Sequence, residues 1–198
     1  NLWWLVVSGI GFAILAASAN EARRPAISHS EAQVFHAVNG LPNWLYWPLW
    51  LPMQLGNLVV GTLVGLAIAW AYGDWWMAAG VVVATISKLG TEKLVRREMA
   101  DYLVIRQRPG TSQVDAIVRG ADVPTSGASF PSGHVILVAA IATVVAPALP
   151  VGWWWVPLLV TLLVMFGRVF VGAHNPLDVT AGFGTGLVVG GIVAVFVR

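Results

Sequence analysis

Six long apolar segments divide this chain, and each is about as long as a membrane-spanning helix requires. They cover residues 2–18, 52–72, 75–95, 132–149, 153–172 and 177–197. A span needs roughly twenty mostly apolar residues. Its backbone polar groups must bond within the segment when they lie in lipid, which favours helices. We therefore predict an all-α integral membrane bundle of six transmembrane helices.

The composition supports a membrane protein and excludes several other classes. Hydrophobic residues make up 58% of the chain and charged residues 10%, whereas about a quarter of a soluble domain is charged. The net charge of +2 is too small to indicate a nucleic-acid partner, and the lack of cysteine excludes disulfides and thiolate metal sites. We expect one domain over residues 1–198, with its motifs within 93–178. The chain starts at Asn1 and stops abruptly at Arg198, so we also expect a piece of a longer protein.

Tryptophan pairs and triplets mark one end of the predicted bundle. Trp3 and Trp4 open the first segment, Trp75 and Trp76 open the third, and 153–155 open the fifth. In a six-helix path these positions share one face of the membrane. Indole rings favour the membrane interface, so the clusters support the predicted path.

The opposite face carries the long connections. Residues 31–50 place three tryptophans at helical spacing beside two prolines, which predicts a broken amphipathic segment lying in the interface. A connecting loop packed on the bundle is the alternative. Residues 106–130 form a long polar loop, and loops of that length are usually functional or disordered. We predict that this loop lies over an active site.

Glycines recur every four residues in two of the apolar segments. One segment holds Gly61 and Gly65, and another holds Gly182, Gly186 and Gly190. Small residues at this spacing let helix backbones approach closely, which predicts helix–helix contacts. A nucleotide-binding loop is a poor alternative, because no strand precedes the glycines and no acidic partner follows at the right distance.

The sequence Pro131-Ser132-Gly133-His134 begins the fourth apolar segment. Proline is favoured in the first turn of a helix, and the free backbone N–H groups there bind anions. Ser132 adds a hydroxyl donor, Gly133 lets an oxygen approach closely, and His134 can give a proton to a leaving oxygen. The alternative is an ordinary helix start with a capping serine.

A second cluster of ionisable residues lies between the fifth and sixth segments. Arg168 ends one predicted helix, His174 lies in the turn, and Asp178 follows in the first turn of the next helix. Asp178 can hold one imidazole N–H and leave the other nitrogen as a nucleophile, while Arg168 offers a planar fork for phosphate oxygens. The alternative is a buried His–Asp pair that only ties two helices together. A third element is Arg108-Pro109, at the end of a third helix that we expect to continue to about residue 105.

These motifs together resemble the type 2 phosphatidic acid phosphatases, which share their active site with vanadium haloperoxidases. That family shows Lys, six residues and Arg-Pro, then Pro-Ser-Gly-His, then Arg, five residues, His, three residues and Asp. The second and third motifs match here without a gap, and the resemblance covers roughly residues 50–198.

The resemblance implies a set of roles. His174 would attack phosphorus to form a phosphohistidine, Asp178 would orient His174, and His134 would protonate the leaving group. The phosphoryl oxygens would be held by the remaining motif residues, which are Arg108, Arg168, Ser132 and the N–H of Gly133. The resemblance implies no metal and no cofactor.

The first motif departs from the family pattern. Asp101 stands where the family lysine would precede Arg108 by seven residues, which places the wrong sign of charge toward a phosphate. Arg97 lies on nearly the same helix face and is a candidate replacement, although it can also pair with Asp101 at i, i+4. The alternative is that Asp101 meets a cationic group on the substrate head.

We expect an integral-membrane lipid phosphatase that hydrolyses a phosphomonoester or pyrophosphate of a lipid in the bilayer. A lipid phosphotransferase and a degenerate lipid-phosphate-binding module are the alternatives. The motif-bearing face is rich in arginine and lysine, which by the positive-inside rule places it in the cytoplasm. Resemblance to bacterial members implies a site on the outer face of the cytoplasmic membrane, and we favour that placement. The residues do not indicate an oligomeric state.

Overall fold

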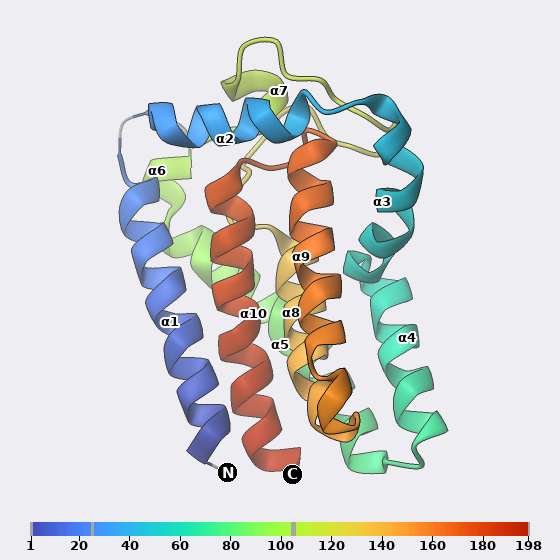
Figure 1. Cartoon of the computed structure of the whole chain (residues 1–198). Helices are drawn as coiled ribbons and strands as arrows, with labels where there is room; N and C mark the ends of the chain where they lie inside the picture. The colour runs from blue at the N-terminus through green and yellow to red at the C-terminus, as the bar shows by residue number, and fades with distance from the viewer. Residues whose placement is uncertain (1, 25, 104–105, 198) are drawn as a thin grey trace.

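The computed structural model describes residues 2–24, 26–103 and 106–197 of the chain (Figure 1). The regular elements within these ranges are all helices. In chain order they are α1 Leu2–Ala22, α2 His29–Asn39, η1 Asn43–Leu45, α3 Tyr46–Met53, η2 Gln54–Gly56, α4 Leu58–Ala71, α5 Trp75–Glu98, α6 Ala100–Leu103, α7 Pro109–Ser112, α8 Gly133–Val145, η3 Ala146–Ala148, η4 Val151–Trp153, α9 Trp155–Phe170 and α10 Pro176–Val197.

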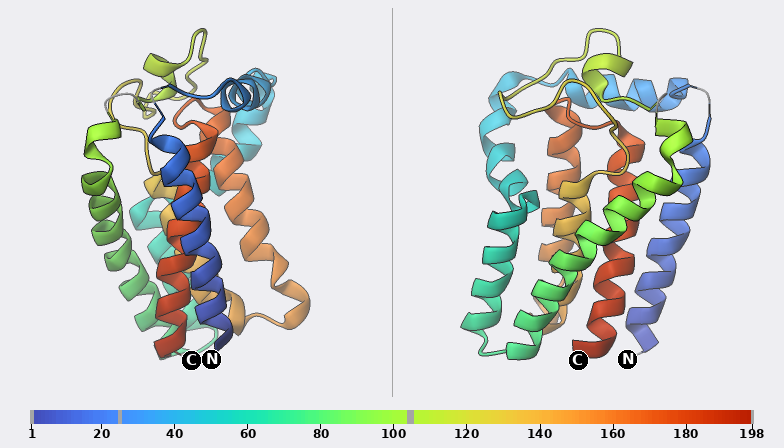
Figure 2. Two further views of the ribbon diagram at one scale, coloured as in Figure 1. Left: turned by 90° about the vertical axis from the view of Figure 1, so that its left-hand side faces the viewer. Right: turned by 180° about the vertical axis from the view of Figure 1, so that it is seen from behind.

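The long helices run between two ends of a bundle, and the long connections gather at one end. Helices α1, α4, α8, α9 and α10 run lengthwise, while α2 lies across the end where α7 also lies (Figure 1). Helix α5 crosses the back of the bundle at a slant (Figure 2). Both chain termini lie at the end opposite α2. The predicted segment 31–50 is a broken helical segment formed by α2, η1 and α3, and the alternative of a connecting loop is wrong.

The helices are apolar enough for an integral membrane protein. Three of the described helices are long and apolar enough to cross a membrane: Leu2–Ala22, Val151–Phe170 and Pro176–Val197. A fourth candidate is the pair Asn43–Gly56 and Leu58–Ala71, which is bent by 76°. The predicted all-α membrane bundle is thus confirmed, while the number of six spans stays a prediction.

Helices α8 and α10 form the centre of the bundle, and glycines allow their close packing. A Cβ atom at Gly186 would lie 2.5 Å from the Cβ of Ala139 in α8, and one at Gly190 would lie 2.6 Å from the Cβ of Thr143. The neighbouring Gly184 and Gly191 face α1 in the same way. The predicted packing role of Gly186 and Gly190 is confirmed, because a Cβ atom at either position would lie too close to α8.

Local capping explains where two of the helices start. The Asn57 side chain accepts hydrogen bonds from the backbone N–H groups of Val59 and Val60 at the start of α4. Asp74 accepts one from Met77 at the start of α5. The prediction that the third helix continues to about residue 105 is wrong, because α5 ends at Glu98 and the short α6 follows.

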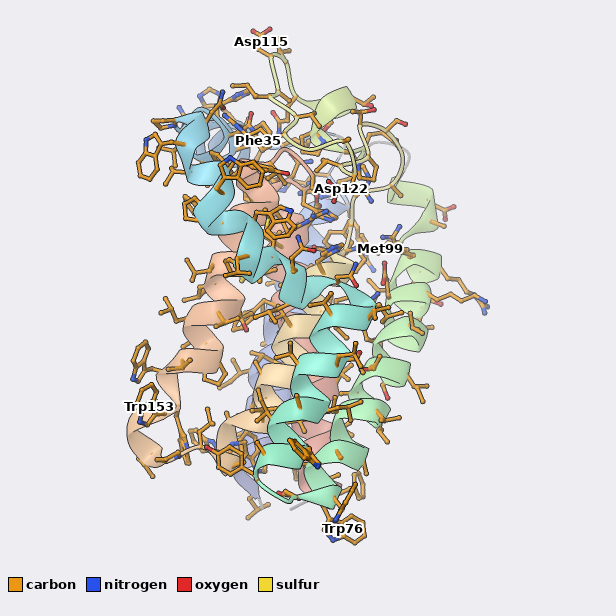
Figure 3. All side chains as sticks on the ribbon, turned by 90° about the vertical axis from the view of Figure 1, so that its right-hand side faces the viewer. Phe35, Trp76, Met99, Asp115, Asp122 and Trp153 are labelled. Carbon is orange, nitrogen blue, oxygen red and sulfur yellow. The ribbon has the colours of Figure 1, made fainter. Side chains whose placement is uncertain are left out.

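The two ends of the bundle differ in the residues that they expose. Trp76 and Trp153 lie toward the end opposite Asp115 in the long loop (Figure 3). Both tryptophans are exposed, as expected for indoles at a membrane interface. The residues of the charged motifs lie toward the other end, so the candidate site lies at one end of the bundle.

Candidate active site

The turn between α9 and α10 presents His174 to the interior. The backbone N–H groups of Ala173 and His174 both donate to the carbonyl oxygen of Arg168, which closes the end of α9. Gly172 has a φ of +74°, a conformation that favours glycine. A Cβ atom there would also lie 2.7 Å from the carbonyl oxygen of Ile117. The long loop and this turn therefore pack backbone against backbone.

The ring of His174 is oriented by a backbone carbonyl. Its Nδ1 atom lies 2.9 Å from the carbonyl oxygen of Ser129, which fixes the proton on Nδ1 and leaves Nε2 with a free lone pair. The predicted direct hydrogen bond from the His174 N–H to Asp178 is wrong, because the Oδ2 atom of Asp178 lies 3.9 Å from Nδ1. Asp178 is linked to His174 indirectly, since it accepts a hydrogen bond from the hydroxyl of Ser129.

Asp178 is fully buried and has several donors around it. The backbone N–H of Asn175 donates to Oδ2 at 2.8 Å, and Nε of Arg106 donates to Oδ1 at 2.8 Å. Together with the Ser129 hydroxyl, these donors compensate a carboxylate that would otherwise be costly to bury. The aspartate therefore ties together the turn of His174, the start of α10 and both ends of the long loop.

Glu31 and Arg106 extend this network to α2. The Arg106 guanidinium donates to both oxygens of Glu31, and the backbone N–H of Leu177 donates to Oε1 at 2.9 Å. The two side chains are only 5% and 8% exposed. Burial by itself would lower the pKa of Arg106, but the carboxylates of Asp178 and Glu31 outweigh it and raise that pKa.

The environment of His174 favours a neutral imidazole. Burial lowers the pKa of His174 well below its ordinary value, and the charges of Arg168 and Arg108 lower it further. Both effects disfavour the imidazolium. At neutral pH the Nε2 atom of His174 is therefore an unprotonated nitrogen.

The start of α8 presents unused donors. Ser132 is the residue before the first turn, yet its side chain makes no capping hydrogen bond. Its Oγ atom is buried and, within the described ranges, has no hydrogen-bond partner. The alternative of a capping serine is thus wrong. Two residues along, His134 lies within reach of the charge of Arg168, so this helix start and the turn of His174 share one region.

The predicted arginines Arg108 and Arg168 lie around the same region. Arg108 donates from Nη1 to the carbonyl oxygen of Ala173 at 2.9 Å, next to His174. Arg168 is buried, and its Nε atom is another donor without a partner among the described residues. Burial lowers the pKa of Arg108, and the charge of Arg96 adds to this effect. Cations and unpaired hydrogen-bond donors in one region favour the binding of an anion.

The two residues predicted near the first motif lie elsewhere. The Arg97 side chain is 82% exposed, beside Glu98, and Asp101 is exposed on α6. Both predictions assumed a continuous helix through these residues, and the end of α5 at Glu98 removes that assumption. The structure instead turns Arg96 inward, where it donates to Glu92 at 2.9 Å.

A small polar cavity of about 40 Å³ adjoins His134 and Arg168. The remaining lining residues of this polar cavity include Gln54, Asn57 and Asp122. In Figure 3, Asp122 lies in the long loop, nearer to the bundle than Asp115. The cavity offers both hydrogen-bond donors and acceptors to a polar head group.

An apolar groove of about 410 Å³ runs along the bundle beside the polar cavity. Its walls come from α4 and α9 and its floor from α8, and it extends from Leu55 to Trp153. Leu55 lies between Gln54 and Asn57 of the polar cavity in sequence, so the η2 turn links the two spaces. The volume and the apolar lining of this groove suit a hydrocarbon chain.

The long loop is held to the bundle by residues that the sequence did not single out. Asn39 donates to the carbonyl oxygens of Ile117 and Phe170 at 2.8 and 2.9 Å. Arg119 is buried, donates to the carbonyl oxygen of Phe170 and stacks over that ring at 4.2 Å. Asparagine and arginine in a loop carry no signal of such anchoring.

Among residues 2–24, 26–103 and 106–197, no three His, Cys, Asp or Glu side chains are grouped to hold a metal ion. The groups around His174 are instead the carbonyl and hydroxyl of Ser129 and the charges of Arg168 and Arg108. The two guanidinium groups suit an anion better than a cation.

Comparison with known proteins supports the resemblance in the motifs. The family model of the PAP2 superfamily matches residues 75–198. The decaprenylphosphoryl-5-phosphoribose phosphatase of Mycobacterium tuberculosis is 30% identical over 142 residues, which cover 70% of each chain. The undecaprenyl-diphosphatase of Sulfolobus acidocaldarius is 33% identical over 90 residues, 46% of this chain and 43% of that protein.

Two solved structures share the fold. The PAP2-type phosphatidylglycerolphosphate phosphatase of Bacillus subtilis superposes with a TM-score of 0.70 at 22% identity, over 96% of this chain and 94% of that one. LpxE of Aquifex aeolicus superposes with a TM-score of 0.66 at 21% identity, over 83% and 93%. The likeness extends to the α1–α4 part of the chain, which lies outside the matched family region.

Proposed function

Because the chain belongs to the PAP2 superfamily, we propose that it is an integral-membrane lipid phosphatase that works through a phosphohistidine and without a metal ion. One observation carries the proposal. Ser132 and Arg168 place unpaired buried donors around a neutral His174. A phosphoryl group can accept hydrogen bonds from such donors and react with such a nucleophile. Phosphoryl transfer depends mostly on positioning and charge stabilisation.

The proposed reaction has two steps. The Nε2 atom of His174 forms a bond to phosphorus as the bond from phosphorus to the lipid oxygen breaks, and His134 gives the leaving oxygen its proton. Water then attacks the phosphohistidine, His134 accepts a proton from it, and the P–N bond breaks to release inorganic phosphate. The phosphoryl oxygens are held by Arg108, Arg168, the Ser132 hydroxyl and the free N–H of Gly133 at the start of α8.

Asp178 has a positioning role in this scheme. Its hydrogen bond from Ser129 fixes the residue whose carbonyl holds His174. The Asp178 carboxylate also lies 3.9 Å from Nδ1 of His174. Its negative charge would stabilise the positive charge that develops on the imidazole ring during attack.

We further propose that the lipid is a polyprenyl phosphate, diphosphate or phosphosugar. The names of two relatives from distant organisms concern decaprenyl and undecaprenyl carriers. The apolar groove between α4 and α9 would hold part of the chain, while the head group passes the η2 turn into the polar cavity. The site would lie on the outer face of a bacterial cytoplasmic membrane.

Phosphate release from a panel of lipid phosphates tests the proposal. The purified protein in detergent should release phosphate from polyprenyl substrates with EDTA present, and a His174→Gln variant that remains folded should release none. Transfer of the phosphoryl group to an added lipid acceptor, with no free phosphate, would show a phosphotransferase instead. Folded protein that releases and transfers nothing would contradict the catalytic proposal.

A further inference from the structure

Three charged residues on α5 form a ladder that the proposed mechanism does not use. Lys88, Glu92 and Arg96 follow one another at intervals of four residues and therefore share one helix face. Lys88 Nζ lies 2.7 Å from Glu92 Oε2, and Arg96 Nη2 lies 2.9 Å from Glu92 Oε1. The three side chains are 13%, 19% and 33% exposed, so the ladder points toward the bundle.

The ladder reaches the proposed site at two places. The carboxylate of Glu92 lies against Gly133, where a Cβ atom would be 2.6 Å from Oε2. At its far end, the charge of Arg96 acts on Arg108. The ladder therefore lies along the start of α8, next to the donors that hold the phosphoryl group in the proposed mechanism.

Arg96 keeps one donor unused in this position. Its Nε atom is buried and has no hydrogen-bond partner among the described residues, as is also true of Ser132 Oγ and Arg168 Nε. These three atoms are the unpaired buried side-chain donors in the described ranges, and each belongs to a residue around the same site. A buried donor without a partner is costly, and so is bringing two guanidinium groups together. A dianionic ligand between Arg96 and Arg108 would accept a hydrogen bond from the unpaired Nε and would offset the repulsion between the two guanidinium groups.

We propose that Arg96, held by Glu92, is a phosphate-binding residue of this site, where Nη2 stays on Glu92 and Nε donates to a phosphoryl oxygen. The proposal rests on the proposed function and names a contact that the sequence motifs do not. Arg96 thereby supplies a cation in place of the family lysine, whose position is occupied here by Asp101, an exposed residue of α6. The intervening break in the helix after Glu98 explains why the cation comes from an earlier turn.

Orthovanadate, a phosphate analogue, gives a readout of binding that does not depend on turnover. We expect Arg96→Gln to weaken vanadate binding and to lower kcat/KM by about 10-fold to 100-fold, the range for one charge-assisted hydrogen bond. Arg97→Gln is the matched control, because it makes the same change one residue along where the side chain is 82% exposed. It should leave both quantities within about twofold. Equal values for the two variants would overturn the proposal.

A second variant separates a phosphate contact from simple neutralisation of Glu92. In Arg96→Gln the Glu92 carboxylate loses one of its two cations and could itself repel vanadate or disturb folding. The double variant Glu92→Gln/Arg96→Gln removes that carboxylate, and we expect vanadate binding to stay weak. Recovery of wild-type binding in the folded double variant would show that Arg96 only neutralises Glu92, and would overturn the proposal.

The two proposals fail in different ways. Wild-type protein that hydrolyses no lipid phosphate, but loses vanadate binding in Arg96→Gln and not in Arg97→Gln, would contradict the phosphatase and support the Arg96 contact. Wild-type protein that is active and unaffected by Arg96→Gln would support the phosphatase and contradict the contact.

Discussion

The imidazole of His174 is held by the backbone carbonyl of Ser129, at 2.9 Å from Nδ1. A carbonyl oxygen accepts only, so it fixes one tautomer at any pH at which the ring is neutral. A backbone group cannot be removed by substitution of its own side chain. Asp178 positions Ser129 through the hydroxyl, but the group that sets the tautomer of the proposed nucleophile is the Ser129 carbonyl.

This arrangement predicts an uneven effect of two substitutions. His174→Gln should abolish phosphate release. Asp178→Asn should keep a measurable rate, because the Ser129 carbonyl still orients the ring. If an aspartate set the tautomer directly, its loss would cost about 10⁴-fold in kcat, as in serine proteases. Single-turnover kinetics with a polyprenyl phosphate would measure both variants, and equal rates would contradict the role of Ser129.

The buried pair Glu31–Arg106 should contribute to stability far more than an exposed pair. We expect Glu31→Gln to cost about 3 kcal/mol of folding free energy, because Arg106 and the Leu177 N–H lose a buried carboxylate. The control is Glu21→Gln, which removes the carboxylate partner of the exposed Arg24 and should cost less than about 1 kcal/mol. Thermal unfolding in detergent measures both, and similar melting temperatures would show that the network does not stabilise the fold.

The lowered pKa of His174 predicts a pH dependence of stability. The unfolded chain protonates this ring near pH ~6.5, whereas the folded protein does not until the pH is much lower. The unfolded state therefore binds more protons below that pH, and the folded state loses stability as the pH falls. The Tm of the wild type should drop more steeply between about pH 6.5 and 5 than the Tm of His174→Gln. Parallel curves would contradict a depressed pKa.

The apolar groove should distinguish long from short substrates. Val64 lines the groove, and Val64→Trp should raise KM for a polyprenyl phosphate while leaving a water-soluble phosphomonoester unaffected. Leu63→Trp is the matched control on the adjacent exposed position outside the groove. If both variants or neither changed KM for the long substrate, the tail would bind elsewhere.

The sidedness of the site can be measured because the chain has no cysteine. Val114 in the long loop and Val151 at the opposite end are 78% and 77% exposed, so Val114→Cys and Val151→Cys are matched probes. In intact cells an impermeant maleimide should label Val114→Cys and not Val151→Cys if the site faces outward. The reverse pattern would place the site in the cytoplasm.

Patterns within short stretches of sequence predicted much of the protein correctly. Apolar length predicted the helical membrane bundle, and glycines at four-residue spacing predicted the contacts of α10 with α8. The two motifs around His134 and His174 led to the family, which the comparisons then showed. Each of these signals is local, because it depends on the helical repeat or on a turn that its own residues form.

Errors arose where the prediction needed the path of the chain between motifs. The assumption of one helix through residue 105 placed Arg97 and Asp101 near the site, whereas the helix ends at Glu98 and turns Arg96 inward. Glu31 stands three residues after Ser28, a spacing that signals a helix start and says nothing of a partner at Arg106, 75 residues away.

By itself the sequence determined the class of fold, the membrane setting and the motifs that indicate the family, because hydrophobic burial and helix geometry act over a few turns. Only the tertiary structure decided which groups hold those residues. Ser129 orients His174, Glu31 and Arg106 secure Asp178, and Arg96 lies beside Arg108. Such contacts join segments far apart in the chain, and a buried polar group accepts whichever partner the packing brings within hydrogen-bond distance.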